Sequence, residues 1–186
     1  IFFGGPAIVD EMEGRTLTYL TLRPVGKGTL FVGKALAAIA VALPIVLLPM
    51  LGLFAICLSQ SPDLGLAAQS LGSLLGAVAL GTATYTAIFA ALGAAFASGL
   101  LASIIYFVVF EMVLGALPVL ELLSIRYHVR TTAGVTATDR LGVLDQLVLD
   151  EPIVLDWWVG ATILGTLVVV GVAVGAWIFR ERQYYV

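Results

Sequence analysis

Apolar runs dominate the chain, and four of them are long enough to cross a lipid bilayer as helices. They cover residues 35–58, 67–96, 100–117 and 157–179. A hydrocarbon core about 30 Å thick requires roughly 20 apolar residues in a helix. The pattern predicts an all-α polytopic membrane helix bundle with about four complete spans, in one transmembrane domain over residues 1–186. We interpret the apolar residues 1–9 as the end of a further span whose beginning precedes the sequence given.

The composition supports a membrane protein and excludes several kinds of site. Hydrophobic residues make up 61% of the chain and charged residues 11%, whereas soluble domains carry about 25% charged residues. With one cysteine and one histidine, the chain offers no thiolate–imidazole metal site and no nucleophile–base constellation. It also lacks the basic patch with interleaved aromatic residues that is typical of nucleic acid binding. We therefore expect no metal, no cofactor and no nucleic acid partner.

The distribution of basic residues predicts how the chain is oriented in the membrane. Arg15, Arg23, Lys27 and Lys34 precede the first complete span, and Arg180 and Arg182 follow the last. Four crossings return the chain to its starting side, and the positive-inside rule makes that side cytoplasmic. Residues 119–156 carry an acidic excess and are expected to form an external segment. The prediction is a multi-pass protein of the cell (cytoplasmic or inner) membrane, with residues 10–34 and the C-terminus in the cytoplasm.

Residues 10–23 form the most informative polar segment. Asp10 can cap a helix start, and Pro24 disfavours helical geometry at Arg23, so the pattern predicts a helix between them. This helix is too short and too polar to span a bilayer, and one mixed face suits it to the membrane surface. The residues alone leave two interpretations open, a simple amphipathic connector and a docking element for a cytoplasmic partner.

The string Asp-Glu-x-Glu-x-Arg-Thr-Leu-x-Tyr-Leu-x-x-Arg-Pro-Val over residues 10–25, followed by Gly33 and Lys34, resembles the ABC-2 type permeases. The resemblance implies six membrane helices, with residues 1–9 ending the second and the four complete spans forming the third to sixth. It implies that residues 10–23 are a cytoplasmic coupling helix that docks on a separate ABC ATPase subunit. The implied contacts are Glu11, Glu13, Arg15, Thr16, Tyr19, Leu20 and Arg23.

The same resemblance implies a transporter subunit that is not itself an enzyme. ATP is hydrolysed on the partner chain, and a second permease subunit, identical or related, completes the complex. Export is the expected direction because exporters dominate the family. A near match to a phosphate-binding loop at residues 28–35 lacks the hydroxyl residue after Lys34, so we expect no nucleotide site there. Residues 110–130 also resemble the end of the fifth helix and the external re-entrant region of such permeases.

Glu111 is the charged residue that interrupts an expected span. A carboxylate in a membrane helix is costly unless it is neutral, paired or facing water. Glu111 is therefore a candidate for a substrate path, and the alternative is that it reaches polar surroundings near the helix end before Pro118. His128 lies between two arginines in the external segment and is expected to be solvated. Residues 138–149 are expected to form a short helix on the outer surface.

Two GxxxG patterns, residues 72–76 and 171–175, predict close helix packing, either within one bundle or between two copies. Two other functions compete with the transporter. One is a membrane anchor or assembly scaffold that recruits a soluble partner without transport. The other is an intramembrane enzyme, for which Glu111 is the one candidate residue. Co-purification with an ATPase that depends on residues 10–23 distinguishes the transporter from both.

Overall fold

A computed structural model describes residues 26–59, 64–96, 98–117, 120–134 and 155–181. Several predicted features lie outside these ranges: the apolar residues 1–9, the helix over 10–23 with its contact residues, and the helix over 138–149. Regular structure in the described residues is entirely helical. This confirms the predicted all-α class.

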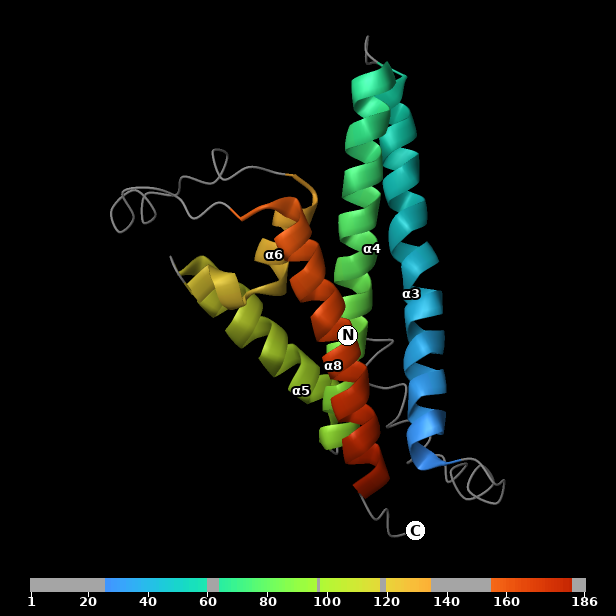
Figure 1. Ribbon diagram of the computed structural model, residues 1–186, viewed down its shortest axis with the longest axis vertical. Helices are drawn as coiled ribbons and strands as arrows, with labels where there is room; N and C mark the ends of the chain where they lie inside the picture. Colours follow the sequence, from blue (N-terminus) through green and yellow to red (C-terminus); the bar gives the residue numbers. More distant parts are fainter. Residues whose placement is uncertain (1–25, 60–63, 97, 118–119, 135–154, 182–186) are drawn as a thin grey trace. The chain divides into compact units, whose positions relative to one another are not determined.

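Eight helical elements follow one another along the described chain (Figure 1). They are α3 (Lys27–Leu58), α4 (Leu64–Ala95), α5 (Gly99–Tyr106), the π-helix η1 (Phe107–Val113), the 3-10 helices η2 (Leu114–Ala116) and η3 (Leu120–Leu123), α6 (Ile125–Thr132) and α8 (Trp157–Glu181). Helices α3, α4 and α8 are long and apolar enough to cross a membrane. The apolar stretch over Gly99–Val113 is shorter. The protein is therefore a membrane helix bundle.

The helices differ most from the apolar runs in two places. Helix α3 begins at Lys27, ahead of the uncharged run that starts at residue 35, so Lys34 lies inside the helix. A long lysine side chain near a helix end can extend its charge to water, so this charge does not stop the helix. Residues 100–117 are not one regular α-helix, because α5 gives way to the π-helix η1 and then to η2. The chemical setting of that change involves Glu111 and is described below.

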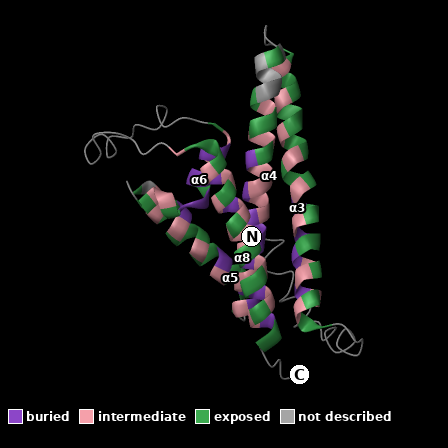
Figure 2. Ribbon diagram, in the orientation of Figure 1, coloured by how far each residue is buried: buried purple, intermediate pink, exposed green. Residues whose placement is uncertain are grey.

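The surface of α3 is suited to lipid. Figure 2 shows exposed positions along most of this helix. Its exposed large apolar side chains include Leu48 and Leu53, which is 67% exposed. Pro44 and Pro49 lie within α3. Membrane helices tolerate proline when neighbouring groups bond to the carbonyls that it leaves without a partner. So much exposed apolar surface would be insoluble in water, and lipid is the solvent that it fits.

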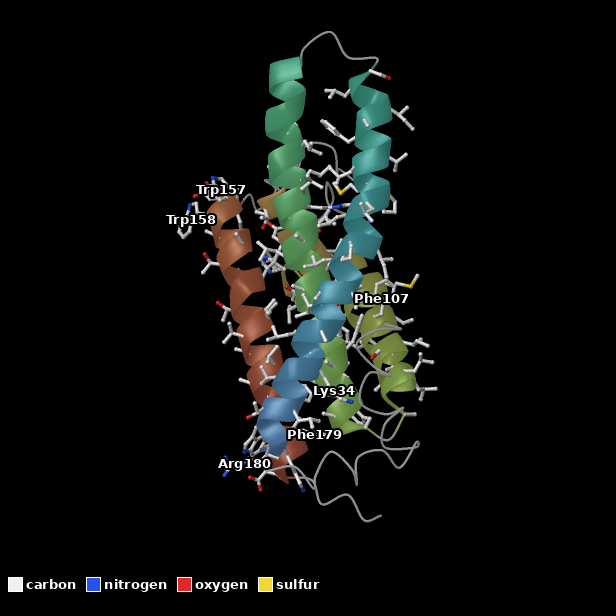
Figure 3. All side chains as sticks on the ribbon, turned by 90° about the vertical axis from the view of Figure 1, so that its right-hand side faces the viewer. Lys34, Phe107, Trp157, Trp158, Phe179 and Arg180 are labelled. Atoms are coloured by element: carbon white, nitrogen blue, oxygen red, sulfur yellow. The ribbon has the colours of Figure 1, made fainter. Side chains whose placement is uncertain are left out.

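Helix α8 carries aromatic and basic residues at its two ends. Figure 3 shows Trp157 and Trp158 at its first turn and Arg180 at its last. Its 25 residues extend over roughly 37 Å at 1.5 Å per residue, enough to cross the hydrocarbon core. Tryptophan rings at one boundary and arginine at the other are typical of membrane interfaces.

The chain divides into two compact units. The first contains the described residues within 1–43, 82–106 and 166–186, and the second those within 44–81 and 107–165. The core of the first unit joins α3, α4 and α8 through five buried side chains: Phe31, Ala35, Ala90, Ala94 and Phe179. The rings of Phe31 and Phe179 have centroids 6.0 Å apart, so the start of α3 packs against the end of α8.

The GxxxG pattern at Gly171 and Gly175 lies in this core. A Cβ atom on Gly175 would overlap the ring of Phe31 and lie 3.1 Å from Cα of Ala91. A Cβ atom on Gly171 would make ordinary contact with Ala87, at 3.4 Å or more. Gly175 therefore lets α8 approach α3 and α4 closely, a packing role within one chain.

This difference predicts the effect of two alanine substitutions in one motif. Gly175→Ala forces a fully buried ring to move, and we expect the free energy of unfolding to fall by about 1–2 kcal/mol. Gly171→Ala adds a methyl group where there is room and should be neutral or slightly stabilising. Thermal unfolding of both variants in the same detergent, followed by tryptophan fluorescence, measures the difference. Equal melting temperatures would contradict the packing role of Gly175.

Candidate functional site: a buried carboxylate at the start of α6

The structure describes one of the predicted site residues, Glu111, and places it in the π-helix η1. The predicted ATPase contacts, from Glu11 to Arg23, lie outside the described residues. Glu111 is 4% exposed. Its surroundings lie in the second unit, where η1, η2, η3 and α6 follow one another along the chain.

The carboxylate of Glu111 accepts hydrogen bonds from three consecutive residues at the start of α6. Its Oε1 atom accepts from the backbone N–H of Ile125 at 2.9 Å. Its Oε2 atom accepts from the hydroxyl of Ser124 at 2.7 Å and from the backbone N–H of Arg126 at 3.2 Å. The first N–H groups of a helix have no partner within the helix, and negative charge is favourable at that end. Glu111 thus caps α6 from another element.

The usual capping residue takes part in this arrangement without capping the helix itself. Ser124 occupies the N-cap position of α6, but its side chain makes no capping hydrogen bond to the backbone. Its buried hydroxyl donates to Glu111 instead. The carboxylate accepts the backbone hydrogen bonds that the side chain of an N-cap serine commonly accepts.

The backbone that carries Glu111 toward α6 is not a regular α-helix. Residues 107–113 form a π-helix, whose wider turns are frequent at functional sites in proteins. Gly115 follows in η2, where a Cβ atom would lie 3.3 Å from Oγ of Ser124. A larger residue at position 115 would crowd the serine that donates to Glu111. Residues 107–116 therefore depart from α-helical geometry before the start of α6, and the span over 100–117 stays a prediction.

Helix α6 also packs against glycines in the parts of α4 and α8 that belong to the same unit. Figure 1 shows α6 beside the first turns of α8. A Cβ atom on Gly81 of α4 would lie 2.5 Å from Cγ2 of Val129. A Cβ atom on Gly160 of α8 would lie 2.8 Å from Oγ1 of Thr132 and 2.9 Å from the carbonyl oxygen of His128. The absence of side chains at these two glycines is what lets α6 fit closely against α4 and α8.

His128 is buried, with 5% of its surface exposed, and the expectation of a solvated histidine is wrong. The reason is that residues 125–132 form a helix with one face packed inward. Its Nε2 atom lies 2.9 Å from the carbonyl oxygen of Leu122. A carbonyl can only accept, so Nε2 carries the proton in the neutral ring. The three- and four-residue spacing of Ile125, His128 and Thr132 was the sequence signal for this inward face.

The second ring nitrogen of His128 has a different environment. Its Nδ1 atom is buried and has no hydrogen-bond partner among the described residues. Burial lowers the pKa of His128 below its ordinary value of 6.5, and the Leu122 hydrogen bond and the charge of Glu111 partly oppose this shift. His128 lies in α6, outside the helices that are long and apolar enough to span the membrane.

The hydrogen bonds of Glu111 position the start of α6. The Glu111 carboxylate is engaged with donors from Ser124, Ile125 and Arg126, so it is not placed as a free base. The described residues contain no group of three or more side chains that could hold a metal ion. A role of Glu111 in a substrate path stays a prediction.

Comparison with known proteins identifies the family. A family described as ABC-2 family transporter protein matches residues 1–183. No curated protein and no solved structure matches the chain. Because the match covers nearly the whole chain, and the helices are those of a membrane bundle, the resemblance to the ABC-2 type permeases is confirmed. The chain belongs to the ABC-2 family of transporter proteins, as a membrane permease of the ABC transporters.

Proposed function

We propose that the chain is the membrane subunit of an ATP-driven exporter, and that residues 10–23 couple it to a separate ATPase subunit. The observation that carries this proposal is the family match over residues 1–183. Permeases of this family are not themselves the ATPase. They work with ABC ATPases and often dimerise. A second permease subunit, a copy of this chain or a relative, would complete the complex.

The packing at the start of α3 supports a route for the coupling. Residues 10–23 lead within a few residues into α3, which begins at Lys27. The first turns of α3 pack against the end of α8 through Phe31 and Phe179. In the proposed mechanism, closure of the ATPase pair on ATP moves residues 10–23. The displacement passes along the chain to α3 and through the Phe31 contact to α8.

The basic residues of the first unit support the proposed orientation. Figure 3 shows Lys34 on α3 toward the end of this unit where α8 reaches Arg180. The contact of Phe31 with Phe179 brings the start of α3 and the end of α8 together. Basic residues gathered at one end favour the cytoplasmic side. We accordingly place the ATPase side of the permease, with residues 10–34 and the C-terminus, in the cytoplasm of a cell whose cytoplasmic membrane holds the complex.

An affinity pull-down of the full-length protein in mild detergent tests the coupling. In the Glu13→Lys/Leu20→Asp variant, the first change reverses a charge and the second places a new charge in the proposed contact. We therefore expect an ATPase to co-purify with the native protein but not with this variant. The matched control is Glu151→Lys/Leu155→Asp, the same changes in the segment expected outside. It should retain the ATPase. If the native protein recovers no ATPase, the scaffold function replaces the transporter. If both variants retain it, residues 10–23 are not the docking element.

A further inference from the structure

His128 has one ring nitrogen bonded and the other buried without a partner. The Nε2–H group donates to the carbonyl of Leu122, at the end of η3, and Nδ1 makes no hydrogen bond with any of the described residues. The neutral ring satisfies this geometry at the cost of one unused lone pair. A protonated ring would carry a second N–H group into the same buried position.

We propose that His128 is a buried proton-binding site, and that binding of a proton there releases α6 from its packed position against η3 and α8. The proposal concerns the second unit alone and does not rest on the transport function. It assigns to the proton a site that is separate from the Glu111 carboxylate, although Glu111 caps the helix that carries His128.

The groups around His128 offer a proton little compensation. Charged side chains on the neighbouring described elements are Glu111 on η1, Glu121 on η3, Arg126 and Arg130 on α6 itself, and Asp156 just before α8. The stretches of α4 and α8 within this unit, residues 64–81 and 157–165, carry no charged residue. Of these groups, Glu111 is the one whose charge acts on the ring.

The Glu111 carboxylate is poorly able to serve as the missing acceptor. Ser124, Ile125 and Arg126 already occupy three of the about four lone-pair sites of its two oxygens, and neither oxygen makes a hydrogen bond with Nδ1 of His128. A move of Glu111 toward the ring would therefore uncap α6. If the ring turns toward water instead, it breaks the bond from Nε2 to Leu122. Either response to protonation loosens the start of α6.

The loosened region includes the contact with α8. The backbone carbonyl of His128 lies where a side chain on Gly160 would be, and Thr132 donates its hydroxyl to that same carbonyl. A shift of the peptide at His128 thus changes the spacing between the two helices directly. The proton site and the helix contact share one residue.

The direction of the pH effect follows from burial. Because burial lowers the pKa of His128 in the folded protein, the unfolded chain binds the proton more readily. Stability from the neutral ring is complete well above the ordinary value of 6.5 and is lost as the pH falls below 6.5 toward the lowered pKa. Acidification is therefore expected to destabilise this unit.

The experiment compares the full-length native protein with His128→Gln in detergent. The Gln amide can donate to Leu122 in place of Nε2–H but cannot take up a proton. The first measurement is the ¹⁵N spectrum of protein labelled at histidine, in which the His128 signals are those missing from the variant. The second is the melting temperature of both proteins at pH 8 and at pH 5.

The expected result has two parts. The His128 ring carries its proton on Nε2 at pH 6.5 and titrates only at lower pH. Over the same range the native protein loses several more degrees of melting temperature than His128→Gln. A ring that is half protonated at its ordinary pKa overturns the proposal, because it is then not buried as described. Parallel loss of stability in the two proteins also overturns it. If the variant fails to fold at pH 8, the coincidence of ring titration with loss of native stability decides the matter.

Discussion

Replacing Glu111 with leucine is expected to destabilise the protein more than any other single change in α5, η1 or α6. Leucine fills a similar volume but accepts no hydrogen bond. It leaves the Ser124 hydroxyl and the N–H groups of Ile125 and Arg126 without their acceptor in a largely buried position. Each buried donor left unsatisfied costs about 1–3 kcal/mol, and the three together should cost about 3 kcal/mol or more. The apparent melting temperature should fall by roughly 5–10 °C.

Two further variants distinguish the loss of the hydrogen bonds that cap α6 from the loss of a negative charge. Glu111→Gln keeps the shape but turns one acceptor into a donor that faces other donors, so it should lose most of the same stability. Glu121→Gln makes the same chemical change in the neighbouring η3 and should have little effect, because Glu121 is not among the residues that cap α6. Tryptophan fluorescence on heating measures all three variants. Equal melting of Glu111→Gln and Glu121→Gln would show that the cap contributes little.

Gly160→Leu is expected to have the second largest effect. The position of its Cβ atom lies 2.8 Å from Oγ1 of Thr132 and 2.9 Å from the backbone carbonyl of His128. A leucine side chain at position 160 could displace the Thr132 side chain. The His128 carbonyl is part of the α6 backbone, so it can move only if α6 itself moves. Overpacking of this kind costs about 1–3 kcal/mol and occasionally more, and we expect the upper part of that range.

The same helix supplies the control. Gly165→Leu introduces an identical side chain at a position where nothing lies within 4 Å of the Cβ atom. It should leave the melting temperature near that of the native protein, whereas Gly160→Leu should lower it by about 5 °C or more. If both leucine variants melt together, α6 and α8 are not closely packed at Gly160.

The sequence predicted the three long apolar helices α3, α4 and α8 because their signal is local. A run of about 20 uncharged residues has few alternatives to a spanning helix. The family was also predictable, since residues 10–25 carry a distinctive string. Glu111 was singled out as a candidate site residue by the same reasoning, because a carboxylate stands out within an apolar run.

What Glu111 contacts could not be predicted from local patterns. Its partners lie 13 to 15 residues further along the chain, and an irregular π-helix lies on the way. Apolar periodicity does not indicate where a helix changes from α to π. The burial of His128 was missed for a related reason. It depends on the packing of α6 against glycines of α4 and α8, distant in sequence, and two adjacent arginines suggested a solvated loop instead.

The contact of α6 with Gly160 sets the order in which the neighbours of α6 can assemble during synthesis of the chain. Glu111 and its partners at residues 124–126 leave the ribosome almost together, so the cap can form as soon as this stretch is made. Gly160 follows Thr132 by a further 28 residues. Until α8 has been synthesised and inserted, the His128 and Thr132 side of α6 lacks this neighbour. The insertion of α8 is therefore the step that completes the packing of α6, and a nascent chain that stalls before Gly160 presents a capped but incompletely packed helix to the quality-control machinery.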